Sequence, residues 1–514
     1  MAPLLTIRNF TSIDIVIKSL ERFEDPNTKQ SKAAAFPSAR KNAQTIAPSA
    51  PELGLHVQTF KRQDVDVTLA PFESYTLRTP PIEEAKPKPS SKLSSTTFRI
   101  TIEDEERERF RIDTNPTYTQ KGSRTFTPLT PNPSNSYTAL YHPTAPTAHL
   151  TIHAHHLPNY AKWMQSLPDT LPLSAISIPG THNSHTHYRA LPSVRCQLVD
   201  VKTQLENGIR FLDIRVQPAS ATDTSKRDLH LVHGAFPISL TGTKYLDPIL
   251  TACYTFLSQN PSETILISLK REGIGSATDA HLASILEKHY LAPNAEKWYT
   301  GTAIPYLSSA RGKLVLVRRY ETPSPSPSPH GLDATAWPHN STHALHGPFC
   351  VQDYCEINHP SSIPQKLLHA NAHLVRAGDV THFIPGLNTD DKNPIPPAPL
   401  YLNFLSGSNF FNVGTWPGGI ARVVNRGVEE WVCSGHHLAV PLGDPQEPGR
   451  ASMVGDEEGG DVAGVEDGVR KVKEGDGGAG VVVMDMVGEG GNWDLVRLVV
   501  GMNMGVVEKV RRGM

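Results

Sequence analysis

The sequence predicts an α/β fold that combines two architectures: a TIM-type (β/α)8 barrel, regular or irregular, and an all-β, sandwich-like domain that precedes it. Two observations carry this prediction. In residues 156–514, eight short apolar runs alternate with amphipathic helical patterns, and about eight such units close a parallel sheet into a barrel. In residues 1–155, apolar and polar residues alternate with a period of two, which is typical of antiparallel strands with one face in water.

The barrel strands are expected to be short and buried. Their apolar runs lie at 174–178, 211–215, 229–232, 264–269, 313–318, 349–353, 400–405 and 481–486. Helical patterns separate several of them and lie at 199–207, 245–258, 277–290, 364–376, 419–432 and 493–511. The carboxyl ends of parallel barrel strands form the rim where active sites are built. The polar residues close to these ends are therefore site candidates: His182, Arg215, His233, Lys270, Arg319, Asp353, Asn403 and Asp485.

The N-terminal region carries no chemical motif. Its strand-like runs lie at 13–17, 65–69, 98–102, 110–112 and 150–152, and polar or Pro/Ser-rich loops separate them. We expect a β-rich accessory domain over residues 1–155 with disordered loops. Two interpretations stay open for it: a module that binds a lipid surface or a partner, and a packing domain that covers the barrel.

Two insertions are expected to interrupt the barrel, at 321–347 and 441–480. The first contains Pro323–Pro329, in which Pro and Ser alternate, as in a stiff and extended loop. The second contains 11 Gly, 10 Asp or Glu and 4 Lys or Arg, which gives a charge of −6 (4 − 10). This composition predicts disorder.

Three of the candidate side chains suit one reaction. His182, Arg215 and His233 fall within 51 residues (233 − 182), each near the end of an apolar run. In the displacement at a phosphodiester, one histidine takes the proton from the attacking hydroxyl and the other protonates the leaving oxygen. An arginine neutralises the charge that develops on the phosphoryl oxygens, and no metal is formally required. Histidines that merely satisfy loop carbonyls are the structural alternative.

Eight segments in order carry a resemblance to a known family. They are Pro179–Ser184, Gly208–Arg215, His233–Gly234, Glu263–Lys270, Arg311–Tyr320, Val351–Asp353, Tyr401–Phe404 and Val482–Asp485. Together they resemble the X domain of phosphatidylinositol-specific phospholipase C in its bacterial, metal-independent form, within the superfamily of phospholipase C-like phosphodiesterases. The resemblance covers roughly residues 160–510.

The resemblance implies a role for each matching residue. His182 is the general base that deprotonates the inositol 2-hydroxyl, and Asp485 orients its imidazole. His233 is the general acid for the diacylglycerol oxygen, and Arg215 holds the phosphate. The residues expected to bind the inositol hydroxyls are Lys270, Arg319 and Asp353. The implied products are diacylglycerol and inositol 1,2-cyclic phosphate.

Two positions depart from the bacterial pattern. Asn183 stands where the family carries an aspartate that partners the general-acid histidine, and a neutral amide cannot raise an imidazole pKa by charge. Cys355 stands where the family has a tyrosine that stacks on inositol, so Tyr354 is the candidate to supply that contact.

Two other functions compete with an inositol phospholipid phosphodiesterase. Asn183 favours a catalytically weak X-domain module that binds lipid or a partner. A metal-dependent glycerophosphodiester phosphodiesterase would need carboxylates at the first strand ends. Arg215 and Lys270 stand where calcium ligands are expected, and the cluster His182, His185 and His187 lacks a nearby cysteine for zinc. We expect no metal and no other cofactor.

The composition limits partners and location. A net charge of −2 gives no reason to expect nucleic acid, and no apolar run is long enough to span a membrane. Arg8 comes too early for a signal-peptide core, and five cysteines without a pattern suit a reducing compartment. We expect a cytoplasmic protein that associates peripherally with membranes and whose partner is an inositol phospholipid at the membrane surface.

Overall fold

The computed structural model describes residues 4–24, 59–78, 96–114, 124–142, 147–154, 159–322, 330–434, 436–438, 468–470 and 474–513. The chain divides into two compact units. Unit 1 comprises Met1–Arg40, Ile46–His155 and Cys433–Lys473. Unit 2 comprises Lys41–Thr45, His156–Val432 and Glu474–Met514.

Unit 1 consists of two β-sheets in its described residues. A six-stranded sheet has the order β21-β4-β1-β10-β9-β7, and a five-stranded sheet has the order β3-β2-β5-β6-β8. Ile7 and Ile152 of the first sheet and Ile17 and Ile100 of the second belong to one buried apolar cluster. The strands are β1 (Leu4–Phe10), β2 (Ile15–Glu24), β3 (Thr59–Leu69), β4 (Ser74–Arg78), β5 (Thr96–Asp104), β6 (Arg109–Thr114), β7 (Arg124–Thr125), β8 (Thr127–Pro128), β9 (Tyr137–His142), β10 (Thr147–Ala154) and β21 (Gly468–Arg470).

Unit 2 contains one mainly parallel sheet. Its order is β15-β16-β14-β12-β11-β22-β20-β19-β18, with β13 paired to β12 and β17 paired to β16. The strands are β11 (Ile178–Thr181), β12 (Phe211–Pro218), β13 (Leu229–Leu231), β14 (Ile265–Arg271), β15 (Trp298–Tyr299), β16 (Leu314–Arg319), β17 (Leu332–Asp333), β18 (Ala344–His346), β19 (Phe349–Gln352), β20 (Leu400–Phe404) and β22 (Val481–Met484). Continuous apolar runs such as β22 are buried throughout, as expected for strands that are covered on both faces.

The prediction of eight parallel barrel strands is wrong at two points. The first strand begins at Ile178 instead of residue 174, because Leu173–Ala175 form a turn of 3-10 helix. The run at 229–232 is β13, which pairs antiparallel with β12 as a hairpin. A parallel strand needs a long crossover connection, and no helix lies between β12 and β13. In the described residues, β16 and β19 do not pair, so the sheet is curled and open rather than closed.

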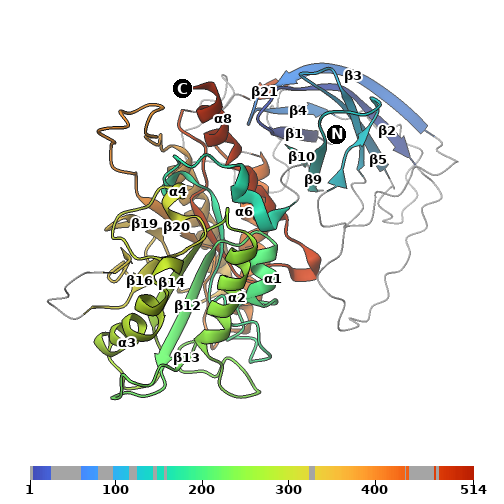
Figure 1. Ribbon diagram of the computed structural model, residues 1–514. Coiled ribbons are helices and arrows are strands. Elements are labelled where there is room, and N and C mark those ends of the chain that lie inside the picture. The colour runs from blue at the N-terminus through green and yellow to red at the C-terminus, as the bar shows by residue number, and fades with distance from the viewer. Residues whose placement is uncertain are drawn as a thin grey trace. The chain divides into compact units, whose positions relative to one another are not determined.

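Helices lie beside this sheet, close to where the sequence predicts them. Figure 1 shows α1, α2 and α3 alongside β12, β14 and β16. Farther along the chain, α5 packs on β19 and β20, and α7 packs on β11. The helices are α1 (Val201–Glu206), α2 (Leu246–Gln259), α3 (Asp279–Leu286), α4 (Leu307–Ala310), α5 (Ile363–Gly378), α6 (Pro417–Ser434), α7 (Asp494–Gly501) and α8 (Met504–Arg512).

The two predicted insertions have different outcomes. Pro323–Pro329 and most of 441–480 lie outside the described residues, so the predicted disorder stays a prediction there. Within the second insertion, however, Gly468–Arg470 form β21, which pairs antiparallel with β4 of unit 1. The segment that the sequence assigns to the barrel therefore contributes a strand to the N-terminal sheet.

Candidate active site

Strand register brings the candidate residues together at one edge of the sheet. In β11 and β22, Thr181 pairs with Met484, so the next residues, His182 and Asp485, lie side by side. In the neighbouring strands, Arg215 of β12 pairs with Lys270 of β14, and Lys270 pairs with Arg319 of β16. The sheet therefore aligns a histidine–carboxylate pair and a row of three cations at its carboxyl end.

His182 contacts a carboxylate and an aromatic ring. Its Nδ1 lies 2.9 Å from Oδ1 of Asp485, which is buried. Burial lowers the pKa of His182, but the Asp485 carboxylate outweighs burial, so this pKa lies well above its ordinary value. On its other side, the Phe404 ring meets the imidazole edge-on, with centroids 6.3 Å apart. The Asp485 carboxylate therefore orients His182 and favours its protonated form.

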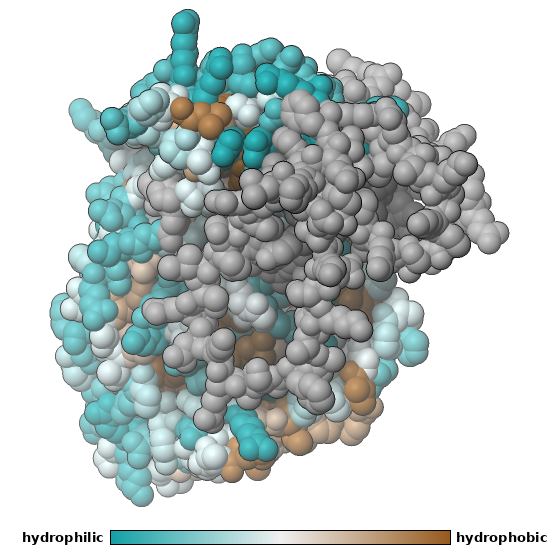
Figure 2. Space-filling model, turned by 90° about the vertical axis from the view of Figure 1, so that its right-hand side faces the viewer, coloured by the Kyte–Doolittle hydropathy of each residue, from teal (hydrophilic) through white to brown (hydrophobic). Residues whose placement is uncertain are grey.

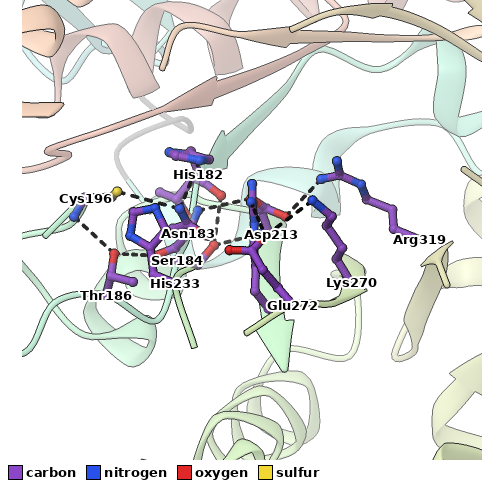
Figure 3. A network of polar contacts seen from close by, with 12 residues as sticks. His182, Asn183, Ser184, Thr186, Cys196, Asp213, His233, Lys270, Glu272 and Arg319 are labelled. Atoms are coloured by element: carbon purple, nitrogen blue, oxygen red, sulfur yellow. Dashed lines mark hydrogen bonds and ion pairs between the residues drawn. The ribbon is translucent and has the colours of Figure 1, made fainter. Parts of the chain in front are cut away.

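Asn183 contacts His182 rather than His233, which corrects the prediction made for this position. The residue is buried and has a left-handed backbone with φ of 41°. Its side-chain Nδ2 lies 3.0 Å from Nε2 of His182 and 3.7 Å from Sγ of Cys196, as Figure 3 shows. Its Oδ1 is buried without a hydrogen-bond partner. An acid at this position would act on the His182 side of the site.

His233 follows the β13 hairpin and faces His182. The two rings are nearly perpendicular, at 89°, with centroids 6.3 Å apart. The Nδ1 of His233 lies 2.8 Å from the backbone carbonyl of Val194, so a proton on Nδ1 is donated to a neutral acceptor. Burial, with the positive charges of Arg215 and His182, lowers the pKa of His233 to about 4. The surroundings of the two histidines therefore shift their pKa values in opposite directions.

Arg215 lies between two carboxylates. Its Nη1 donates to Glu272 at 2.6 Å, and its Nη2 donates to Asp213 at 3.1 Å, while Nε is buried without a partner. Burial favours neutral carboxyls, but Arg215 and its neighbouring cations outweigh burial. They hold the pKa of Glu272 at about 2 and the pKa of Asp213 far below its ordinary value. Arg215 is thus fixed in place and keeps donors for an anionic ligand.

The two other cations of the row share these carboxylates. The Nζ of Lys270 lies 3.3 Å from Glu272, and Nη1 of Arg319 lies 3.4 Å from Asp213. The Arg319 guanidinium also stacks over the Trp337 ring at 3.7 Å from its centroid. Burial lowers the pKa of Arg319 to about 10, so it stays charged at neutral pH. Figure 3 shows Lys270 and Arg319 side by side next to Asp213.

The candidates Asp353 and Tyr354 directly follow β19, and Asn403 lies on β20. The backbone N–H of Asp353 donates to Ser341 at 2.7 Å, and the Asp353 charge acts on Arg319. Tyr354 instead lies with its ring edge-on to His369 of α5, at 5.0 Å. Asn403 is buried and engaged by Gln352 and by the carbonyl of Ala370, so it holds the sheet and α5 together.

In the described residues, His182, His185 and His187 do not form a group of potential metal ligands. The Nε2 of His185 is bound to the carbonyl of Val232, and His187 packs on Tyr188. The carboxylates of Asp213 and Glu272 lie close to Arg215 and Lys270, and Arg215 forms an ion pair with each of them.

Sequence analysis missed three residues of the site, Glu272, Lys366 and Cys196. The sequence carries a signal for the first two but none for Cys196. Glu272 lies two residues after Lys270, and such residues share a face of a strand. Lys366 falls on the apolar stripe of α5, where its buried Nζ lies 3.0 Å from Gln352 and burial lowers its pKa to about 8. Cys196 comes from a loop, and nothing in its sequence context places it beside His182.

Residues 170–320 match the family model "Phosphatidylinositol-specific phospholipase C, X domain". This segment belongs to the X-domain family. The chain is 33% identical over 175 residues to 1-phosphatidylinositol phosphodiesterase of Listeria monocytogenes, covering 32% of this chain and 50% of that protein. It is 26% identical over 213 residues to human PI-PLC X domain-containing protein 1, covering 34% and 60%. The chain thus spans about half the length of the curated relatives it matches.

Solved structures of bacterial relatives align with a larger part of the chain. Phosphatidylinositol-specific phospholipase C from Staphylococcus aureus aligns with a TM-score of 0.47 and 19% identity, covering 67% of this chain and 97% of that one. The enzyme from Listeria monocytogenes aligns with a TM-score of 0.42 and 20% identity, covering 66% and 98%.

Proposed function

We propose that the protein is a metal-independent phosphodiesterase that cleaves phosphatidylinositol or a related inositol phospholipid to diacylglycerol and inositol 1,2-cyclic phosphate. The observation that carries the proposal is the pair of histidines that face each other, with ring centroids 6.3 Å apart, beside the cation row of Arg215, Lys270 and Arg319. This arrangement supplies a proton acceptor, a proton donor and charge for a phosphoryl group.

We assign the steps by the family roles. Neutral His182 takes the proton of the inositol 2-hydroxyl, the 2-oxygen bonds to phosphorus, and the diacylglycerol oxygen leaves with a proton from His233. Arg215 binds the phosphoryl oxygens through donors that its two carboxylates leave free. Lys270, Arg319 and Asp353 bind the inositol hydroxyls.

The pKa values of the free protein run against these roles. His233, the proposed acid, has a pKa of about 4 and is neutral at pH 7, while the pKa of His182, the proposed base, is raised by Asp485. A phosphate anion bound at Arg215 would offset the cationic charge that disfavours protonated His233, so substrate itself raises the pKa of the acid. The productive state remains a minor one, and we therefore expect a slow enzyme.

Exposed apolar side chains at the same edge of unit 2 support action at a membrane. They lie on loops that follow rim strands: Phe236, Leu240, Ile274, Phe411 and Val413. Phe236 also stacks on Phe410, which joins the loops after β13 and β20. Figure 2 shows hydrophobic surface at the lower end of the molecule, the end where β12 and β13 end in Figure 1. We propose that this apolar rim enters the lipid surface, as contiguous exposed apolar residues do in membrane contacts.

None of the helices in the described ranges is both long and apolar enough to cross a bilayer. Cys196, Cys253, Cys350 and Cys355 form no disulfide bond in the structure, and the reducing, cytoplasmic location stays a prediction.

A catalytically weak lipid-binding module is the second candidate. The observation that favours it is the low pKa of His233, the proposed acid, together with the raised pKa of His182 and the neutral Asn183. The test is incubation of purified protein with phosphatidylinositol vesicles and EDTA, with inositol 1,2-cyclic phosphate followed by phosphorus NMR. Cyclic product that is lost in His233→Ala supports the enzyme. Vesicle binding without product supports the module.

A further inference from the structure

One group of potential metal ligands lies inside the site. His182, Cys196 and Asp485 each offer one ligand atom, and these atoms lie within 4.8 Å of one another. A nitrogen, a sulfur and a carboxylate oxygen are the ligand types that zinc prefers. The cysteine that the sequence did not place near His182 is therefore supplied by the fold.

Two buried oxygens at this group lack a partner. They are Oδ2 of Asp485 and Oδ1 of Asn183, and both residues are almost completely shielded from solvent. Rotation of the Asn183 amide by half a turn puts its oxygen where Nδ2 now lies, 3.0 Å from His182 Nε2 and 3.7 Å from Cys196 Sγ. An amide oxygen would then face the same space, and burying polar atoms without partners is costly.

The charges of the group match a divalent ion. When Cys196 binds as the thiolate, it and Asp485 bring two negative charges, which balance one Zn²⁺ among the cations of the site. The proton of the thiol and any proton on the ligating imidazole nitrogen leave to solvent on binding.

We propose that His182, Cys196 and Asp485 form an inhibitory binding site for Zn²⁺, with the Asn183 amide oxygen available as a further ligand. Zinc bound there occupies the imidazole that the proposed reaction needs as its base and separates it from Asp485. The metal switches the site off rather than taking part in the reaction. The inhibition, but not the binding, rests on the proposed function.

Cobalt is the probe that tests binding without activity. Co²⁺ is added to purified full-length protein that has been freed of metal with chelator, and absorption is recorded. We expect a near-ultraviolet band from thiolate-to-cobalt charge transfer that Zn²⁺ abolishes by displacement. Cys196→Ala should lose the band, whereas Cys253→Ala, which changes a buried cysteine of α2, should keep it.

The near-isosteric Cys196→Ser serves as a second variant, and thermal melting of the metal-free proteins checks their folding. Absence of the band in the unaltered protein, or its persistence in folded Cys196→Ser, would overturn the site.

Inhibition is tested separately in the vesicle assay, with each variant compared to its own rate in EDTA. We expect micromolar Zn²⁺ to inhibit the unaltered protein and the half-inhibiting concentration to rise at least ~100-fold in Cys196→Ala. Equal inhibition of both proteins would overturn the role of Cys196. If no activity exists to inhibit, the proposed function fails, and the cobalt band still decides whether the metal site exists.

Discussion

Two arginine–glutamate pairs lie at opposite ends of the same two strands, β12 and β14, and they differ in how completely they are satisfied. At the amino end, Arg210 and Glu263 are fully buried, and all three guanidinium nitrogens of Arg210 have acceptors. At the carboxyl end, Arg215 has two carboxylate partners and a buried Nε without one. The Arg210–Glu263 pair has no donor left for a ligand, whereas the Arg215–Glu272 pair leaves donors of Arg215 for one.

The difference shows how one residue type serves stability or function. Arg210 also binds the carbonyls of Leu205, Ile209, Tyr160 and Ala161, so no donor is left for anything outside the protein. Arg215 belongs to a row whose positive charge exceeds what Asp213 and Glu272 neutralise. The amino end of a barrel sheet generally carries stability and the carboxyl end carries chemistry.

The largest effect is expected for the histidines at the carboxyl end. His182→Ala and His233→Ala should each lower the phosphodiesterase rate by ~10² to 10⁴-fold, because each removes a positioned proton-transfer group. Steady-state rates on phosphatidylinositol vesicles measure this, and Tm should change little. Near-normal turnover in either folded variant would contradict the assignment.

At the amino end, a change should act on stability instead. Glu263→Ala leaves the buried Arg210 charge without its partner and should cost ~3–5 kcal/mol of unfolding free energy. Urea unfolding measures it, and Glu272→Ala at the other end of β14 is the matched control, with a smaller loss of stability. If the two variants were equally destabilised, the distinction between the two ends would not hold.

Asn183→Asp sharpens the comparison within the carboxyl end. The new carboxylate contacts His182, so it should raise the pKa of His182 further. The pKa of His233, at about 4 in the free protein, should stay nearly unchanged. Nitrogen NMR titration of the two imidazoles reads both values. The rate should then need a higher pH to rise, because His182 keeps its proton longer. A rise confined to His233 would show that residue 183 contacts the acid after all.

The smallest effect is expected from chelator. With Arg215 and Lys270 where calcium ligands are expected, the rate in EDTA should equal or exceed the rate without it. Loss of activity in EDTA that micromolar calcium restores would show a metal-dependent enzyme.

The family resemblance implies that Asp485 orients His182, and the structure places the two side chains 2.9 Å apart at the ends of neighbouring strands. The prediction of a parallel strand fails for β13. A short run in which apolar and polar residues alternate, such as Leu229–Leu231, has the same pattern in a parallel strand and in a hairpin. The partner of Asn183 depends on its left-handed backbone, which no spacing shows. Glu272 reaches the site because it lies two residues after Lys270, and this spacing can be read from the sequence. Cys196 reaches the site through the path of its loop, which the sequence does not show.

The pairing of β21 with β4 has a consequence for the order in which the protein is made. The Nη2 of Arg8 donates to the carbonyl of His436 at 2.7 Å, and in the described residues β4, which pairs with β1 on one side, gains its second neighbour from Gly468–Arg470. Both partners leave the ribosome more than 400 residues after Arg8 (436 − 8). The six-stranded sheet of unit 1 is therefore complete only after most of unit 2 has been synthesised. Domains generally fold in order from the N-terminus, so unit 1 departs from that order. Until Gly468–Arg470 have been synthesised, the edge of β4 that they pair with stays unpaired.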